Sequence, residues 1–187
     1  MLFTVGHSNR TFDELMCIIK AHSIDVLVDV RGGSAGSRTF PHFNKMNFEI
    51  EIPKYGIEYV HIPELGGRRG KTPNADPLLN GEWRLDAFRY YADYAYYSES
   101  FQKGINTLLT IGNEVNAAFM CSEAVPWRCH RSIVADYLIK IHNKPITHLL
   151  SVKQTLVGVP HSHSCVYNGR VIYPKLRSYQ GELFVPN

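Results

Sequence analysis

The segment that most restricts the fold is the apolar run Ile24–Val30, which reads IDVLVDV and is rich in β-branched residues. A short, nearly continuous run of this kind is typical of a strand buried on both faces of a parallel sheet. It follows an apolar stretch at Phe3–Val5 and a helix predicted to begin at Thr11, where Glu14 completes a capping-box pattern. A strand, a helix and a strand in this order predict a right-handed βαβ unit.

The alternation of strands and helices continues along most of the chain. Further strands are predicted at Ile57–Ile62, Val115–Met120 and Ile146–Leu150, and helices at Lys45–Tyr55 (broken), Trp83–Tyr97, Phe101–Ile111 and His130–His142. Near the end, Asn168-Gly169 is the signature of a tight hairpin. The sequence therefore predicts an α/β fold, a mostly parallel sheet with helices on both faces, with a small C-terminal hairpin.

The composition fits one globular domain over residues 1–187, with 44% apolar and 20% charged residues. No membrane span is expected, because Ile24–Val30 is too short and contains two aspartates. Residues 1–10 lack the apolar core of a signal peptide, so we expect a cytoplasmic protein. The four cysteines are therefore expected to be thiols or metal ligands rather than disulfides.

Polar residues directly follow several of the predicted strands. His7, with Ser8 beside it, follows the first strand, and Arg31 follows the second. Glu64 comes after the strand at Ile57–Ile62, and Cys121 follows the strand at Val115–Met120. Ligands of parallel α/β sheets bind at the carboxyl ends of the strands. We therefore expect these side chains to gather at one edge of the sheet.

The segment from Cys121 to Arg131 carries the densest set of reactive side chains: Cys121, Glu123, Cys129, His130 and Arg131. Three kinds of chemistry are open. Either cysteine can be a nucleophile with His130 as its base, the two cysteines and His130 can bind a metal, or Glu123 can be a general acid or base. The spacing selects none of them, and a purely structural role, with a buried cysteine at a strand end and a capped helix start, is equally open. Cys-x7-Cys-His is not a standard zinc spacing, and Arg128 comes one residue too late for a Cys-x5-Arg phosphate loop.

Several blocks of the sequence resemble the uncharacterised DUF488 family. They are Gly6-His7-Ser8-Asn9, Asp29-Val30-Arg31 with Ser37-Arg38, Tyr59 with Leu65-Gly66-Gly67-Arg68, Cys121-Ser122-Glu123 with Cys129-His130-Arg131, and Thr147-His148. The resemblance covers about residues 2–150 and leaves 151–187 as a C-terminal extension that carries the hairpin. It implies a fold and a polar site, but no settled activity. This chain departs from the family at Ala35-Gly36, where a proline commonly precedes the Ser-Arg pair.

Further candidates lie outside the cysteine segment. Arg38 and Arg68 occupy glycine-rich loops on the same predicted edge as Arg131, which favours an anion pocket that also includes Arg31. Asp29, at the end of its strand, is either a catalytic group or a structural partner of Arg31. Tyr91, in an aromatic-rich helix, is either a core residue or a side chain that stacks on a ligand.

These observations predict an enzyme of unknown substrate. Its expected ligand is an anionic small molecule or a nucleic acid, bound by arginines beside the Cys/Glu/His group. One alternative is a metal-binding protein that uses Cys121, Cys129 and His130. Another is a nucleic-acid binding module without catalysis, which the modest net charge of +3 argues weakly against. The sequence requires no cofactor, leaves a metal open, predicts no membrane partner and does not define the oligomeric state.

Overall fold

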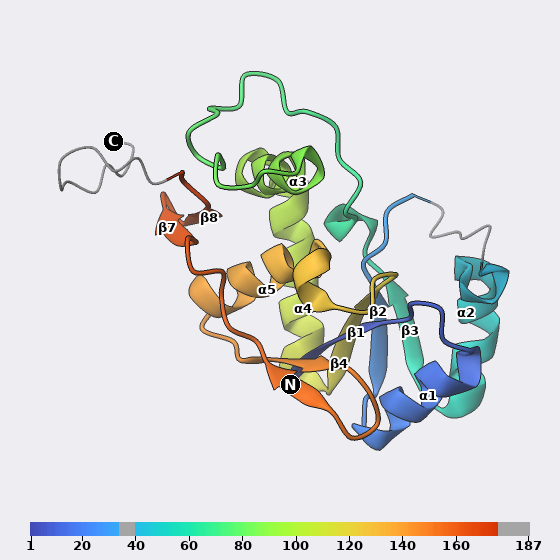
Figure 1. Cartoon of the computed structure of the whole chain (residues 1–187). Coiled ribbons are helices and arrows are strands. Elements are labelled where there is room, and N and C mark those ends of the chain that lie inside the picture. The colour runs from blue at the N-terminus through green and yellow to red at the C-terminus, as the bar shows by residue number, and fades with distance from the viewer. Residues whose placement is uncertain (34–39, 176–187) are drawn as a thin grey trace.

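The fold is a six-stranded sheet with helices on both faces, and a small two-stranded hairpin beside it (Figure 1). The computed structural model describes residues 1–33 and 40–175. The strands are β1 Leu2–Gly6, β2 Val26–Asp29, β3 Glu58–His61, β4 Ala117–Cys121, β5 Ile146–Leu149, β6 Thr155–Val157, β7 Cys165–Tyr167 and β8 Arg170–Ile172. The helices are α1 Phe12–Ala21, α2 Lys45–Glu51, α3 Asp86–Tyr97, α4 Glu99–Glu114 and α5 Arg131–Lys140.

The strand order is β3-β2-β4-β1-β5-β6, and every neighbouring pair from β3 to β5 is parallel. Only the edge strand β6 is antiparallel, to β5. The predicted mostly parallel α/β sheet is therefore confirmed. The predicted hairpin is confirmed as well, because Asn168 and Gly169 both adopt the positive φ angles that its two-residue turn requires.

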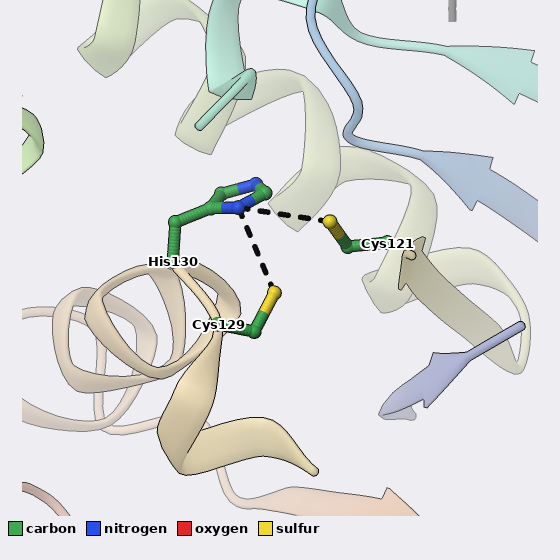
Figure 2. A group of neighbouring side chains, drawn as sticks. All are labelled: Cys121, Cys129 and His130. Atoms are coloured by element: carbon green, nitrogen blue, oxygen red, sulfur yellow. Dashed lines mark hydrogen bonds between the residues drawn. The ribbon is translucent and has the colours of Figure 1, made fainter. Parts of the chain in front are cut away.

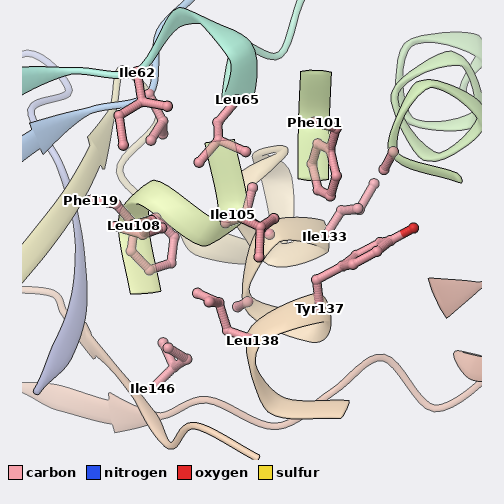
Figure 3. Close-up of a cluster of buried hydrophobic side chains, with 14 of the residues drawn as sticks. Ile62, Leu65, Phe101, Ile105, Leu108, Phe119, Ile133, Tyr137, Leu138 and Ile146 are labelled. Carbon is pink, nitrogen blue, oxygen red and sulfur yellow. The ribbon is translucent and has the colours of Figure 1, made fainter. Parts of the chain in front are cut away.

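Each face of the sheet has its own apolar core. Helices α1 and α2 cover one core, and α4 and α5 cover the other, whose side chains Figure 3 shows. Along β4, Ala117, Phe119 and Cys121 belong to the core under α4 and α5, while Ala118 and Met120 belong to the opposite core. Successive strand residues point to opposite faces of the sheet. The side chain of Cys121 therefore lies on the face that α4 and α5 cover.

The start of α1 shows the predicted capping box. The Thr11 hydroxyl accepts from the Glu14 amide at 3.1 Å, and the Glu14 carboxylate accepts from the Thr11 amide at 2.7 Å. The predicted broken helix at Lys45–Tyr55 is also present, as α2 followed by a 3-10 turn over Ile52–Tyr55. Together these features confirm the local signals read around the first βαβ unit.

Three details differ from the expectation. Strand β6 is not predicted from the sequence. All three of its residues are exposed, so it has no buried face and no alternation of apolar and polar residues. Helix α3 begins at Asp86 rather than Trp83. Helix α4 does not end near Gly112 but continues to Glu114, since the Val115 amide still donates to the Ile111 carbonyl. None of the helices in the described ranges is long and apolar enough to cross a bilayer.

Gly6, the last residue of β1, should be intolerant of any side chain. A Cβ at this position would lie 1.8 Å from the carbonyl oxygen of Glu123, which is backbone and cannot rotate away. We expect Gly6→Ala to lower the free energy of unfolding by about 3 kcal/mol through this overpacking, measured by urea denaturation. Gly70→Ala is the matched control, because a Cβ there meets nothing within 4 Å. Equal stability of the two variants would contradict the close approach.

His148 on β5 should make folding sensitive to acid. Its ring contacts the Thr4 hydroxyl at 2.8 Å, and burial, helped by Arg131, lowers the pKa of His148 to about 4. In the unfolded chain His148 binds a proton near pH 6.5, whereas in the folded chain it stays neutral until about pH 4. The free energy of unfolding therefore falls as the pH drops below about 6.5.

Between pH 7 and pH 5, the wild type should lose about 2 kcal/mol more stability than His148→Gln, which keeps an amide for Thr4 but cannot titrate. His42→Gln, at an exposed position, should retain the wild-type pH dependence. Denaturation at both pH values measures the difference. A His148→Gln slope equal to the wild-type slope would show that this ring does not resist protonation.

Candidate functional site

Arg31 and Cys121, two of the polar residues that follow parallel strands, line one cleft, whereas Glu64 does not line it. The cleft has a volume of about 400 Å³ and lies at the carboxyl ends of β2 and β4. It is lined by Arg31, Gly32, Gly67, Arg68, Ala87, Phe88, Cys121, Ser122, Glu123, Arg128, Cys129 and His130. Of the predicted site residues, Arg31, Arg68, Cys121, Glu123, Cys129 and His130 therefore share one concave surface.

Backbone hydrogen bonds beyond the strand ends fix the loop that carries Cys121. The His7 amide donates to the Cys121 carbonyl at 3.0 Å, and the Ser8 amide donates to the Ser122 carbonyl at 2.8 Å. The pairing of β1 with β4 thus continues into the loops. As a result, the position of Cys121 is set by the sheet itself rather than by a flexible connection.

Cys121, Cys129 and His130 converge on one point (Figure 2). His130 Nδ1 lies 3.7 Å from Cys121 Sγ and 3.6 Å from Cys129 Sγ. Cys121 comes from the end of β4, whereas the other two residues lie between the 3-10 turn Pro126–Arg128 and the start of α5. The fold brings these three side chains together even though eight positions of sequence separate the two cysteines.

The ring of His130 is held in one orientation by contacts with three separate segments. Its Nε2 lies 3.0 Å from the Val30 carbonyl oxygen, which can only accept, so Nε2 carries the proton. The ring of Tyr91 packs edge-on against it, with the centroids 5.0 Å apart. Gly67 leaves the space it occupies, because a Cβ there would lie 2.3 Å from Nδ1. In the neutral ring, the Nδ1 lone pair therefore points at the two sulfurs.

The two thiols ionise very differently. The hydrogen bond with Cys129, followed by burial, raises the pKa of Cys121 well above its ordinary value. Burial also opposes ionisation of Cys129, but the Cys121 hydrogen bond, His130 and Arg131 outweigh it and lower the pKa of Cys129 well below its ordinary value. Arg131 Nε donates to Cys129 Sγ at 3.3 Å. Of the two thiols, Cys129 is therefore the one that ionises more readily, and Arg131 supports its charged form.

Asp29 and Arg31 form a buried ion pair behind the cleft. Arg31 Nε donates to both carboxylate oxygens of Asp29, at 2.9 and 3.1 Å, and a terminal nitrogen donates at 2.6 Å. The Tyr59 hydroxyl donates to the same carboxylate at 2.8 Å. The remaining Arg31 nitrogen lies 3.3 Å from His7 Nε2, and burial lowers the pKa of His7 to about 4, so its neutral ring can accept.

Four of the predicted site residues stand behind the cleft wall rather than on it: His7, Asp29, Tyr91 and Arg131 are 2%, 0%, 0% and 1% exposed. Tyr91 offers no face for a ligand, and its hydroxyl donates to the Leu65 carbonyl at 2.7 Å. Of the two alternatives for Tyr91, the structure has the core residue, because burial encloses the whole ring. The Asp29 carboxylate accepts hydrogen bonds from Arg31 and Tyr59, the structural partnership that was one of the two alternatives for this residue.

The arginines near the cleft fall into two groups: those whose side chains are fixed by hydrogen bonds and those whose side chains are exposed. Arg131 is held by the carbonyl of Glu123 and by Cys129. Arg69, next to Arg68, bonds three backbone carbonyls and lies over the ring of Tyr94. Arg68 and Arg128 are exposed on the cleft wall, and their side chains bond no other residue within the described ranges. Arg38, also predicted to bind an anion, lies outside the described residues.

Other residues of the cleft were not found from the sequence. Ala87 and Phe88 come from the first turns of α3, and Arg128 from the loop before α5. Phe88, Glu123 and Arg128 also border a second cleft of about 600 Å³, which includes the exposed Trp127. Ser8, although predicted, does not line the first cleft, and its hydroxyl donates to Asn9 at 3.3 Å.

Comparison with known proteins identifies the family of the chain. Residues 11–138 match the family described as "Domain of unknown function DUF488", and the chain therefore belongs to that family. The matched region contains the whole Cys121–Arg131 segment together with Arg31 and Arg68. The opening block at Gly6–Asn9 and the strand β5 lie outside it. No curated protein and no solved structure matches the chain.

Removing the charge of Asp29 should destabilise the whole edge of the sheet. Asp29→Asn leaves the guanidinium of Arg31 buried without its counter-ion, and we expect a loss of about 3 kcal/mol in the free energy of unfolding. Tyr59→Phe removes one bond to the same carboxylate and should cost only about 1 kcal/mol. Chemical denaturation measures both. If Asp29→Asn were no more harmful than Tyr59→Phe, the ion pair would not be a structural support.

Proposed function

We propose that this protein is an enzyme that acts on a small anionic molecule, with phosphate as the favoured anionic group. The observation that carries the proposal is the common cleft of two kinds of side chain. Cys121, Cys129 and His130 supply reactive groups, while Arg68 and Arg128 supply exposed positive charge. Arginine binds phosphate and carboxylate oxygens with paired, charge-assisted hydrogen bonds, which suits it to this role.

The roles of the remaining residues follow from their burial. Arg131 is buried and stabilises the Cys129 thiolate, so it tunes the reactive group instead of binding ligand. Asp29 and Tyr59 hold Arg31, whose guanidinium borders the cleft. Glu123 is exposed on the same wall and is the side chain best placed to carry a proton to or from the bound molecule.

The size of the cleft favours a small molecule over a nucleic-acid duplex. A volume of about 400 Å³ falls in the range of sites for drug-sized ligands and cofactors. The net charge of +3 is low for a protein whose main task is to cover a phosphate backbone. A nucleotide or a single flipped nucleotide of a longer strand would satisfy both constraints.

We propose that the protein works in the cytoplasm. All four cysteines are free thiols, and two of them lie close to the same imidazole nitrogen. Neighbouring thiols of this kind are maintained in a reducing compartment and tend to oxidise outside it.

Anion binding is tested with three probes: inorganic phosphate, adenosine monophosphate and a labelled single-stranded oligonucleotide. Arg68→Gln and Arg128→Gln should each weaken the binding of phosphate-bearing probes by about tenfold, the value of one charge-assisted hydrogen bond. Lys153→Gln removes an exposed charge away from the cleft and should leave the dissociation constants unchanged. Calorimetry or fluorescence titration at fixed salt concentration measures the constants.

The same titrations separate the proposal from its rivals. If only the oligonucleotide binds, with an affinity that falls steeply with salt and is unaffected by Cys129→Ser, the protein is a nucleic-acid binding module. If Arg68→Gln and Arg128→Gln bind every probe as well as Lys153→Gln does, the cleft is not the anion site. Turnover, once found on a panel of phosphate esters, should fall at least 100-fold in Cys129→Ser.

A further inference from the structure

We propose that Cys121, Cys129 and His130 bind one zinc ion, with a fourth coordination position open to the cleft. The substrate on which the ion would act is taken from the proposed function. The binding of the ion is argued from the three ligand atoms alone and is tested separately.

The two separations between sulfur and nitrogen are those of a tetrahedral site. With Zn–S bonds of about 2.3 Å and a Zn–N bond of about 2.0 Å, sulfur and nitrogen ligands lie about 3.6 Å apart. The two sulfurs of the site lie 3.7 and 3.6 Å from His130 Nδ1. All three atoms lie within 4.8 Å of one another, so a small side-chain rotation brings the two sulfurs to a tetrahedral separation.

His130 is prepared as a metal ligand by the contact on its far side. Histidines that bind metals usually donate their other ring N–H to a carbonyl or carboxylate, which fixes the tautomer and the ring direction. The Val30 carbonyl receives that hydrogen bond at 3.0 Å. The lone pair of Nδ1 is therefore directed at the sulfurs before any ion arrives.

The cluster holds three possible ligand atoms close together with little solvent around them. Both sulfurs lie within 3.7 Å of His130 Nδ1. Both cysteines are nearly buried, with 8% and 3% exposed, so water cannot complete their bonding freely. A cation at the centre of the three atoms bonds all of them at once.

The donor set points to zinc rather than to a hard cation. Two thiolates and an imidazole suit zinc and other soft or borderline metals, whereas magnesium and calcium prefer oxygen. A search of residues 1–33 and 40–175 for three or more histidine, cysteine or acidic side chains close enough to hold an ion gives this group. Sites with three protein ligands and a free position are typical of catalytic zinc, which binds water or substrate there.

The free position opens into the proposed anion site. Cys121, Cys129 and His130 line the same cleft as Glu123, Arg68 and Arg128. An anion held by the two arginines therefore lies beside the ion, and the Glu123 carboxylate is available to handle a proton. The positive charge of Arg131, which contacts Cys129 from behind, stabilises the thiolate form that the ion requires.

The first experiment measures metal directly. Protein purified without an affinity tag is analysed for elements, and metal-free protein is titrated with Co²⁺ as a coloured replacement for zinc. We expect about one equivalent of metal for each chain, sulfur-to-cobalt absorption in the near ultraviolet, and the visible bands of tetrahedral cobalt. Competition with a chromophoric chelator gives the zinc affinity.

Variants identify the ligands. Cys121→Ser and Cys129→Ser should each lower the zinc affinity by at least 100-fold. Cys165→Ser, at a half-buried thiol of β7, should leave it unchanged. Alkylation of the wild-type protein needs no variant and guards against misfolding: zinc should slow the labelling of Cys121 and Cys129 by at least tenfold, and a strong chelator should restore it.

Three results would overturn the zinc site: the absence of sulfur-to-cobalt absorption, labelling rates that do not respond to zinc, or full zinc affinity in both serine variants. Rapid labelling of Cys129 at neutral pH without any metal effect would indicate a nucleophilic thiolate instead. In that case the anion titrations with Arg68→Gln and Arg128→Gln still decide the proposed function. Zinc binding without any anion binding would support the metal site and refute the proposed function.

Discussion

The site depends on the close approach of two strand ends, those of β1 and β4. Gly6 lies against the backbone of Glu123, and the amides of His7 and Ser8 continue the pairing into the loop after Cys121. This backbone contact fixes the height of the loop above the sheet. The carbonyl of Glu123 then receives the guanidinium of Arg131, whose Nε bonds Cys129. A parallel sheet cannot itself bind a ligand at this edge, but its hydrogen bonds can place the loops that do.

Buried and exposed arginines have different roles at this edge of the sheet. Arg31 and Arg131 are almost fully buried, and each is fixed by hydrogen bonds, to the Asp29 carboxylate in one case and to the Glu123 carbonyl and Cys129 Sγ in the other. Leaving either buried guanidinium without these partners would cost several kcal/mol, so the contacts support the fold. Arg68 and Arg128 are exposed and can turn toward a ligand at little cost. The division explains how a site rich in arginine can be both stable and able to bind an anion.

The sequence predicts the sheet, the capping box and the gathering of polar residues at the strand ends, because these follow from local periodicity and from one rule of parallel topology. It also names Arg68 for the anion pocket, and Arg68 lines the cleft. It does not predict the role of the neighbouring Arg69, which is fixed by carbonyls and by Tyr94, because a loop without periodicity gives no sign of such contacts. Tyr91 shows a similar limit. The pattern indicates an aromatic helix, but only the packing of α3 shows that this ring supports His130 from within the core.

The unusual spacing of the two cysteines arises because they lie on different elements of the fold. In a zinc motif with short spacing, both ligands lie on one turn, and the local backbone sets their distance. Here one sulfur comes from the end of β4, while the other sulfur and the imidazole come from the entrance of α5. Their separation is therefore set by the sheet and by the contacts of His130 with Val30, Tyr91 and Gly67. The sequence names these three residues as possible metal ligands, but their spacing does not show that the three ligand atoms converge, because that depends on the folded chain. The same dependence leaves one side of the cluster open, because no local loop folds over it to supply a further ligand within the described residues.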